Sequence, residues 1–227
     1  MKTCVIIPAY NESKAIAGLI KSVRGYVADT VVIDDGSTDN TAELARQAGA
    51  VVLSFKHNAG KGKALKDGFD YAVKNGYDAV IAMDADGQHS PDDLMNIING
   101  AAAAGTGIVV GNRMDNPEKM PPSRFATNLL MSLIISLICR QNIPDTQCGY
   151  RLIKADVLKK INLISLNYEI ESELLIKASR LGFKIVSVPI KSVYEGQMSL
   201  IHPLVDTWRF FVMLARLSFP RKRESIK

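Results

Sequence analysis

The sequence has few cysteines, little excess charge and no long apolar run. Its 227 residues include three cysteines, Cys4, Cys139 and Cys148, whose spacing matches no metal or redox motif. Unpaired cysteines are typical of the reducing cytosol, so we expect a cytoplasmic protein. The net charge of +5 is too small to indicate a nucleic-acid partner, although it permits anionic ligands or contact with a membrane surface.

No segment reaches the roughly 20 consecutive apolar residues that cross a bilayer. The nearest, residues 129–139, is short and interrupted by Ser132 and Ser136, which predicts a buried or interfacial helix. No signal peptide is visible, because Met1-Lys2 leads directly into a strand pattern. We therefore expect at most a peripheral association with the inner face of the membrane.

Strand and helix patterns alternate through the first half of the chain. Strands are expected at residues 3–7, 30–34, 50–54, 78–83 and 107–110, and helices at residues 13–24, 38–48, 61–74 and 91–104. This alternation predicts an α/β fold with a mostly parallel sheet flanked by helices. Hydrophobic residues make up 47% of the chain, which is enough for a sizeable core.

The pattern changes after Gly111. A polar loop at residues 112–122 precedes expected helices at 123–139 and 168–181, a strand at 183–188 and an amphipathic helix at 203–219. We expect one α/β domain over residues 1–200, followed by an amphipathic helix and a basic tail over residues 201–227.

The C-terminal helix has one broad apolar arc, while Arg209 and Arg216 share a face because they are seven residues apart. Such a helix suits the lipid interface, and a helix packed on the domain core would show a similar arc. The arc consists of Leu204, Val205, Trp208, Phe211, Val212 and Ala215.

Two carboxylates follow the strand pattern at residues 78–83. Asp84 and Asp86 are two residues apart, so an extended backbone would direct both to one side, where they repel unless a cation lies between them. Mg²⁺ and Mn²⁺ prefer oxygen ligands and often share them with substrate phosphates. The segment therefore suggests a metal–diphosphate site.

Polar residues also follow two other strands. Asp34 and Asp35 end the strand at residues 30–34, and Tyr10, Asn11 and Glu12 follow the first strand. Ligands of open α/β sheets bind at this carboxyl edge of the strands. Ordinary turns and helix caps are the alternative interpretation, and they account for Ser13, for Ser90 and for a cap at Ser37 or Thr38.

Four sequence blocks in this order resemble family 2 glycosyltransferases of the GT-A fold. They are VIIPAYNE (residues 5–12), VIDDGSTD (32–39), NAGKGKA (58–64) and DADGQ (84–88). Within the family, Gly111-Asn112-Arg113, Ser123-Arg124 and residues 145–151 resemble the polyprenyl- and dolichyl-phosphate sugar transferases. The resemblance covers residues 5–209.

This resemblance implies a nucleotide-sugar donor, Mg²⁺ or Mn²⁺ as cofactor, and inversion at the anomeric carbon. The metal would neutralise the leaving nucleoside diphosphate. The resemblance assigns the nucleoside to Pro8, Tyr10, Glu12, Ile33 and Asp35, with Ala9, Ala85 and Lys61 also in the donor site. It assigns the metal and diphosphate to Asp84, Asp86 and Gln88, and His89 is a further candidate to line the site.

Arg113 and Arg124 are the candidates to bind an anionic acceptor, because a guanidinium matches phosphate oxygens. A phosphate acceptor is already ionised and needs no general base. For a hydroxyl acceptor, Glu171 is the candidate base, since it falls on the apolar face of its helix. Glu173 and Lys177 are expected to form a surface ion pair. One segment departs from the subgroup: Glu195 and Leu200 stand where basic residues are usual.

The predicted function is a metal-dependent, inverting transfer of sugar from a nucleotide-sugar donor to a lipid-linked polyprenyl phosphate. A hydroxyl acceptor on a polysaccharide or glycolipid is one alternative. A sugar-phosphate nucleotidyltransferase is another, but residues 8–12 occupy the place of its usual glycine- and arginine-rich loop. A receiver-like switch built on Asp34-Asp35 does not explain Asp84 and Asp86.

Overall fold

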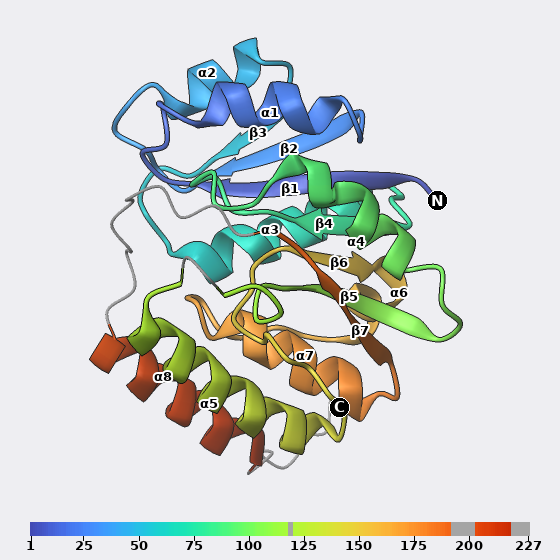
Figure 1. The fold of residues 1–227 in the computed structure, drawn as a ribbon. Coiled ribbons are helices and arrows are strands. Elements are labelled where there is room, and N and C mark those ends of the chain that lie inside the picture. Colours follow the sequence, from blue (N-terminus) through green and yellow to red (C-terminus); the bar gives the residue numbers. More distant parts are fainter. Residues whose placement is uncertain (118–119, 192–202, 219–227) are drawn as a thin grey trace, which may run out of the picture. The chain divides into compact units, whose positions relative to one another are not determined.

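A computed structural model of the chain describes residues 1–117, 120–191 and 203–218. The chain divides into two units, Met1–Gln197 and Met198–Lys227. The first unit contains one seven-stranded sheet of order β3-β2-β1-β4-β6-β5-β7 (Figure 1). Its strands are β1 (Thr3–Ala9), β2 (Asp29–Asp34), β3 (Val51–Ser54), β4 (Ala79–Ala82), β5 (Thr106–Asn112), β6 (Arg151–Lys154) and β7 (Lys184–Pro189).

Neighbouring strands in the described sheet are parallel except where β6 pairs with β4 and β5. The central strands are apolar along their length, because helices cover both faces of a parallel sheet. In β1, residues Cys4, Val5, Ile6 and Ile7 are all fully buried. The mostly parallel α/β sheet predicted from the sequence is therefore confirmed.

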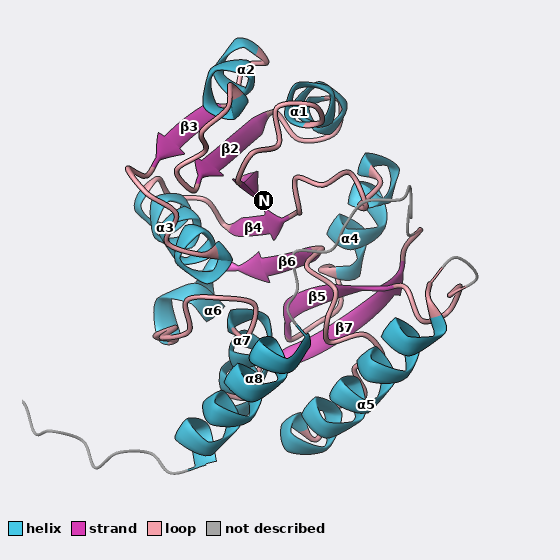
Figure 2. Cartoon of the chain, turned by 90° about the vertical axis from the view of Figure 1, so that its left-hand side faces the viewer, coloured by secondary structure: helices cyan, strands magenta, loops and turns pink. Residues whose placement is uncertain are grey.

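Helices lie on both faces of this sheet (Figure 2). Helices α1 (Ile16–Arg24) and α4 (Leu94–Gly100) cover one face, and α3 (Lys61–Lys74), α6 (Ala155–Lys160) and α7 (Ile170–Arg180) cover the other. Helix α2 (Thr41–Gln47) packs beside β2 and β3, and α5 (Pro122–Cys139) packs on α7. A short 3₁₀ helix, Pro91–Asp93, precedes α4.

Helix ends differ most from the sequence prediction. Helix α3 has the predicted bounds, but α1 and α2 begin at Ile16 and Thr41, three residues later than expected. The helix predicted over residues 91–104 ends at Gly100, and the chain then turns through Gly105 into β5. Strand β6 and helix α6 were not predicted, since a four-residue strand joined directly to a six-residue helix shows no clear period.

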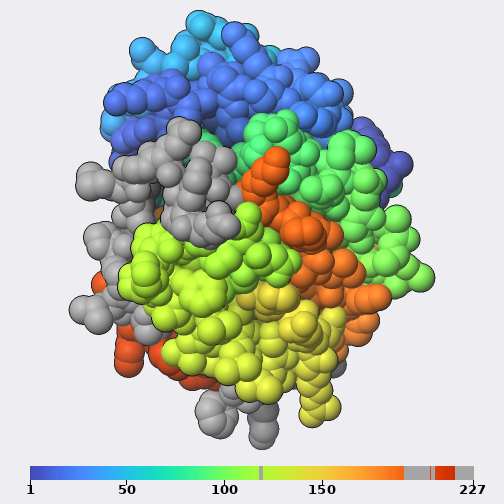
Figure 3. All heavy atoms as spheres, viewed as in Figure 1, coloured from blue at the N-terminus to red at the C-terminus, as the bar shows by residue number. Residues whose placement is uncertain are grey.

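Helix α5 is long and apolar enough, by length and composition alone, to cross a membrane, which the sequence analysis did not anticipate. One face of the helix is nevertheless fixed to the domain: Ser132 and Ile135 are buried, and Ser132 Oγ accepts a hydrogen bond from Thr146 N. The opposite face is exposed, and Figure 3 shows the yellow-green atoms of this helix at the surface. The exposed large apolar residues of this helix are Leu129, Leu130, Leu133, Leu137 and Ile138.

The second unit contains helix α8 (Pro203–Ser218). Its amphipathic character agrees with the sequence pattern, and Val205, Trp208 and Phe211 are exposed. The rings of Phe210 and Phe211 make an edge contact within the helix. Residues 192–202 and 219–227 lie outside the described residues, and with them Glu195, Leu200 and the basic tail.

Candidate active site

The parallel strands bring the predicted donor residues to one edge of the sheet. In the register of the sheet, Ala9 of β1 is paired with Asp34 of β2, and Ile6 of β1 with Ala82 of β4. The segments that follow these strands, residues 10–12, 35–39 and 83–89, therefore start side by side. This is the carboxyl edge where α/β sheets bind ligands.

The residues of these segments differ in exposure. Tyr10 is exposed, and Pro8 and Glu12 are partly buried, so all three can meet a ligand. The side chain of Ile33 is fully buried and lies against Gly68 of α3, so a nucleoside cannot reach it in this structure. Ala9 and Ala85 are also buried.

Asp35 fixes the loop that leads into α3. Its carboxylate accepts hydrogen bonds from Ala59 N at 2.7 Å and Gly60 N at 2.9 Å. The two loops touch at Gly36, which has φ of +73°, and a Cβ there would lie 2.6 Å from the carbonyl carbon of His57. Burial raises the pKa of the Asp35 carboxyl, and the two amides oppose that shift.

The helix cap predicted at Ser37 or Thr38 is wrong. Helix α2 begins only at Thr41, because the polar groups before it bond to the neighbouring loop instead. Asn11, in the left-handed region with φ of 56°, donates its N–H to Ser37 Oγ at 2.9 Å and accepts from Thr38 N at 2.8 Å. Thr41 Oγ1 in turn accepts from Glu12 N. Ser90 does cap the 3₁₀ helix as expected, since its side chain accepts from Asp92 N.

Lys61, the first residue of α3, joins two carboxylates from distant parts of the chain. Its Nζ lies 2.7 Å from Asp84 Oδ1 and 2.8 Å from Glu171 Oε1. Burial alone would lower the pKa of this amine, but the two carboxylates raise it above its usual value. Burial would likewise raise the pKa of the Asp84 carboxyl, whereas Lys61, His89 and Arg113 lower it to about 2. Both groups are therefore charged at neutral pH.

The backbone after β4 does not stay extended, so the predicted geometry of the two aspartates is wrong. The chain turns at residues 85–87, and Asp86 Oδ1 accepts a hydrogen bond from Gln88 N within this turn. Asp84 N donates to His89 Nδ1 at 3.2 Å, which places the proton of a neutral imidazole on Nε2. Gly149 lies directly beside Asp84, and a Cβ there would be 2.7 Å from Asp84 Oδ2.

Glu12 lies near the other carboxylates at this edge of the sheet. The pKa of the Glu12 carboxyl is raised by burial and then by the charges of Asp86, Asp39 and Asp84. The carboxylates that end three strands thus act on one another, and a bound cation would relieve their repulsion.

No three histidine, cysteine, aspartate or glutamate side chains form a complete metal site among the described residues. One or two carboxylates completed by substrate phosphates are the usual site for Mg²⁺, and Asp84 and Asp86 are the residues here that could hold such an ion.

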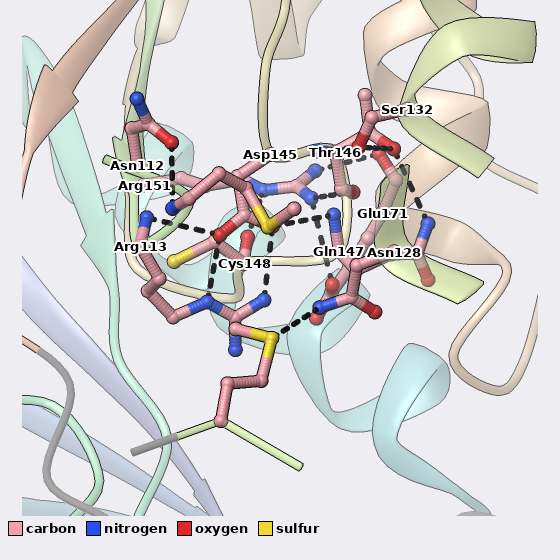
Figure 4. A network of polar contacts seen from close by, with 12 residues as sticks. Asn112, Arg113, Asn128, Ser132, Asp145, Thr146, Gln147, Cys148, Arg151 and Glu171 are labelled. Atoms are coloured by element: carbon pink, nitrogen blue, oxygen red, sulfur yellow. Dashed lines mark hydrogen bonds and ion pairs between the residues drawn. The ribbon is translucent and has the colours of Figure 1, made fainter. Parts of the chain in front are cut away.

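Arg113 and Arg151 are held in a buried polar network beside this turn (Figure 4). Arg113, just past β5, is 5% exposed, and it donates three hydrogen bonds to the Asp145 carboxylate, from its backbone N–H at 3.1 Å, Nε at 2.7 Å and Nη2 at 2.9 Å. It is therefore no surface loop charge. Arg151 of β6 donates to the carbonyl oxygens of Thr146, Cys148 and Glu171.

Residues 145–151 were predicted as a subgroup motif, but Asp145 and Arg151 were not predicted as members of the site. Their signal was the presence of an acid and a base within that motif. The partners that explain them, Arg113 and Glu171, are distant in the sequence.

The two glutamates of α7 have different surroundings from those expected. Glu171 is buried between Lys61 and Arg151, whose Nη2 lies 3.5 Å from Glu171 Oε2. The predicted ion pair of Glu173 with Lys177 is confirmed, but Glu173 is fully buried and not at the surface. Its carboxylate also accepts hydrogen bonds from Ile164 N and Ser165 N. Arg124, in the first turn of α5, is partly buried.

Comparison with known proteins agrees with these motifs. A family model, Glycosyl transferase family 2, matches residues 4–162. The chain belongs to this family of glycosyltransferases.

Two curated relatives cover most of the family 2 chain. The UDP-N-acetylglucosamine–dolichyl-phosphate N-acetylglucosaminyltransferase of Methanococcus voltae is 34% identical over 84% of this chain and 85% of its own length. The undecaprenyl-phosphate mannosyltransferase of Micrococcus luteus is 32% identical over 88% of each chain.

A solved structure shares the fold. Glucosyl-3-phosphoglycerate synthase from Mycobacterium tuberculosis, in complex with Mn²⁺, UDP-glucose and phosphoglyceric acid, superposes with a TM-score of 0.78 at 21% identity. The match covers 97% of this chain and 81% of that chain.

Proposed function

We propose that this glycosyltransferase moves a sugar from a nucleotide-sugar donor to a polyprenyl phosphate at a membrane surface, with inversion at the anomeric carbon. The observation that carries the proposal is the position of Arg113. This buried guanidinium is fixed by Asp145, at the start of the segment whose Gly149 lies directly beside Asp84. A cation fixed there suits a phosphate acceptor, which the names of both relatives also indicate.

The donor would bind along the edge formed by β1, β2 and β4. The nucleoside would meet Pro8, Tyr10 and Glu12, while Asp35 would shape the loop before Lys61. Asp86, with Asp84 and Gln88 beside it, would hold the divalent cation and the diphosphate. Mg²⁺ or Mn²⁺ bound there would neutralise the charge that develops on the leaving diphosphate.

The reaction needs no proton transfer. A phosphate oxygen of the acceptor would form the new bond to the anomeric carbon, while the bond from that carbon to the diphosphate breaks and its electron pair leaves with the nucleoside diphosphate. Arg113 and Arg124 would orient the acceptor phosphate and reduce the repulsion between the two anionic substrates. Because the phosphate monoester is largely a dianion at neutral pH, it is already the nucleophile.

A hydroxyl acceptor would need a general base, and Glu171 is the candidate from the sequence. In the structure, its carboxylate lies between Lys61 and Arg151. Both cations bind the oxygens that a substrate hydroxyl would have to approach. These contacts favour the phosphate acceptor.

We propose that residues 1–200 form the catalytic domain and that residues 201–227 bring it to the membrane. In the described part of that segment, α8 carries exposed Val205, Trp208 and Phe211. An aromatic and apolar surface with nearby arginines suits the lipid interface.

The deciding assay measures nucleoside diphosphate release from a panel of nucleotide sugars with two matched acceptors, polyprenyl phosphate and the polyprenol that lacks the phosphate. We expect turnover with polyprenyl phosphate and none with polyprenol. Release with polyprenol at an equal rate would contradict the phosphate-acceptor assignment and make Glu171 the residue to test as base. No release with any donor and either acceptor would contradict the whole proposal.

A further inference from the structure

Lys61 forms an ion pair with Asp84, one of the carboxylates that we propose for the metal and diphosphate site. Its Nζ is 2.7 Å from Asp84 Oδ1, and its side chain is only 18% exposed. The other oxygen, Asp84 Oδ2, packs against Gly149. Asp84 is thus neutralised within the protein before any ligand binds.

A divalent cation on Asp84 would lie close to the Lys61 ammonium, and like charges at such distances repel strongly in a partly buried site. Asp84 therefore cannot bind the divalent cation and Lys61 at the same time without this repulsion. Asp86 has no such conflict, because the contact described for its carboxylate is the N–H of Gln88 within its own turn.

Glu171 gives Lys61 a second partner. Its Oε1 lies 2.8 Å from Lys61 Nζ, and its other oxygen faces the buried Arg151 at 3.5 Å. The ring of Tyr168 also lies 5.4 Å from the ammonium. Lys61 can therefore leave Asp84 without becoming an unpaired buried charge.

We infer that Lys61 is an exchangeable counter-ion of Asp84: it holds Asp84 in the free enzyme and turns to Glu171 and the donor diphosphate when a divalent cation binds. The inference rests on the proposed function. It assigns to Glu171 the role of a positioning residue, which acts through Lys61. It also implies that the metal binds weakly to the free enzyme and tightly only with the nucleoside diphosphate, because both ligands must displace the same contact.

The test measures Mn²⁺ binding by electron paramagnetic resonance, with the metal alone and with saturating UDP or GDP. Lys61→Met removes the ammonium at similar length, so it should bind Mn²⁺ alone about tenfold or more tightly than wild type. Its affinity should also depend less on the nucleotide. Glu171→Gln should have the opposite effect and weaken binding of Mn²⁺ alone, since Lys61 then has only Asp84 as an anionic partner.

Lys63→Met is the matched control. Lys63 lies one half-turn away on the same helix, where it pairs with Asp67, and its removal should leave Mn²⁺ affinity unchanged. Thermal melting of each variant reports whether it folds. If Lys61→Met does not fold, the sign of the Glu171→Gln effect decides.

The inference is overturned if folded Lys61→Met binds Mn²⁺ no more tightly than wild type. It is also overturned if Glu171→Gln binds Mn²⁺ as tightly as wild type or more tightly. Wild type that binds Mn²⁺ and transfers sugar would then still support the proposed function. Wild type that fails to bind Mn²⁺ with either nucleotide would overturn both, because the metal dependence itself would be absent.

Discussion

The two aspartates that follow β4 have different partners although they are two residues apart. Asp84 is paired with Lys61 and packed on Gly149, whereas Asp86 is partly exposed in a turn that Gly87 and Gln88 complete. Asp86 is therefore better placed as the principal metal ligand. Asp84 would join it only when Lys61 has moved.

Asp86→Asn should lower turnover about 100-fold or more, since losing a metal removes several kcal/mol of charge stabilisation from the transition state. The substitution keeps the volume, and the amide oxygen can still accept from Gln88 N, so the melting temperature should stay close to that of wild type. Nucleoside diphosphate release, measured over a range of Mg²⁺ and Mn²⁺ concentrations, checks this. Full activity of the variant, or of wild type with excess chelator, would rule out the metal role.

Asp35→Ala should weaken nucleotide binding up to about 30-fold, because two hydrogen bonds that hold the loop before Lys61 are lost at about 1 kcal/mol each. Mn²⁺ binding should change less, since Asp35 lies at a different strand end from Asp86. Asp35→Asn keeps one acceptor for Ala59 or Gly60 and should give an intermediate affinity. Calorimetric titration with UDP and GDP makes the comparison, and unchanged affinity in both variants would limit Asp35 to loop structure.

Arg124→Ala should reduce transfer to polyprenyl phosphate about tenfold or more, as expected for the loss of one charge-assisted contact to phosphate, with little effect on donor binding. Arg140→Asn is the control at the other end of α5, where asparagine tolerates the left-handed φ of 52°. Arg113→Ala is a poorer test because it leaves buried Asp145 unpaired, which costs about 3–5 kcal/mol. Transfer by Arg124→Ala at the wild-type rate would contradict its acceptor role.

Strands were easier to predict than the elements around them. The apolar runs of β1, β2 and β4 are buried on both faces, so each can be located from sequence, and their ends indicated the ligand edge. Helix starts were predicted less accurately. Ser37 and Thr38 were expected to cap α2, but Ser37 Oγ accepts a hydrogen bond from Asn11 N, and Thr38 N donates one to Asn11 Oδ1. Strand β6 is too short for its period to be visible, yet it inserts between β4 and β5 and carries Arg151.

Helix α7 is anchored through Glu173, whose burial could not be predicted from its pairing with Lys177 alone. Burial would raise the pKa of this carboxyl, but hydrogen bonds from Lys177, Ser165 and Ile164 outweigh burial and lower it from its ordinary 4.5. A lowered folded-state pKa means that the stabilisation is fully present above pH 4.5 and is lost as the pH falls through the folded-state value.

Glu173→Gln should accordingly reduce the free energy of unfolding at pH 7 by about 1–3 kcal/mol, because the backbone amides keep only a neutral partner. The difference in the free energy of unfolding between variant and wild type should shrink in acid, because Glu173 of the wild type is then protonated and neutral like glutamine. Urea unfolding at pH 7 and in acid measures this difference. Glu43→Gln, at an exposed position on α2, is the control and should have little effect at either pH. A difference that stays constant with pH would show that the charge of Glu173 does not matter.

In the molecule as a whole, the gathering of these strand ends at one edge of the sheet could be predicted, because each strand end carries its own local motif. The network of Lys61 could not, since it joins residues that follow β4 and that lie on α7, far apart in the sequence. The pairing of Arg113 with Asp145 is of the same kind. Sequence motifs thus indicated which residues gather at the site, and tertiary contacts decide which of their charges are already paired.

The proposed membrane association assigns lipid binding to residues 201–227, and we expect full-length protein to float with anionic liposomes. Removing residues 202–227 should leave a soluble protein that no longer floats, because it loses the apolar arc, the tryptophan and the nearby cations that suit a helix at the lipid interface. Trp208→Asp, at a position 70% exposed on α8, should weaken flotation without altering the fold. Leu181→Asp makes the same change at an exposed apolar residue after α7 and should float like wild type.

Two outcomes would contradict this role of α8. If the truncated chain still floats, the exposed leucines of α5 become the surface to test. If full-length protein does not float, α8 has another partner than lipid.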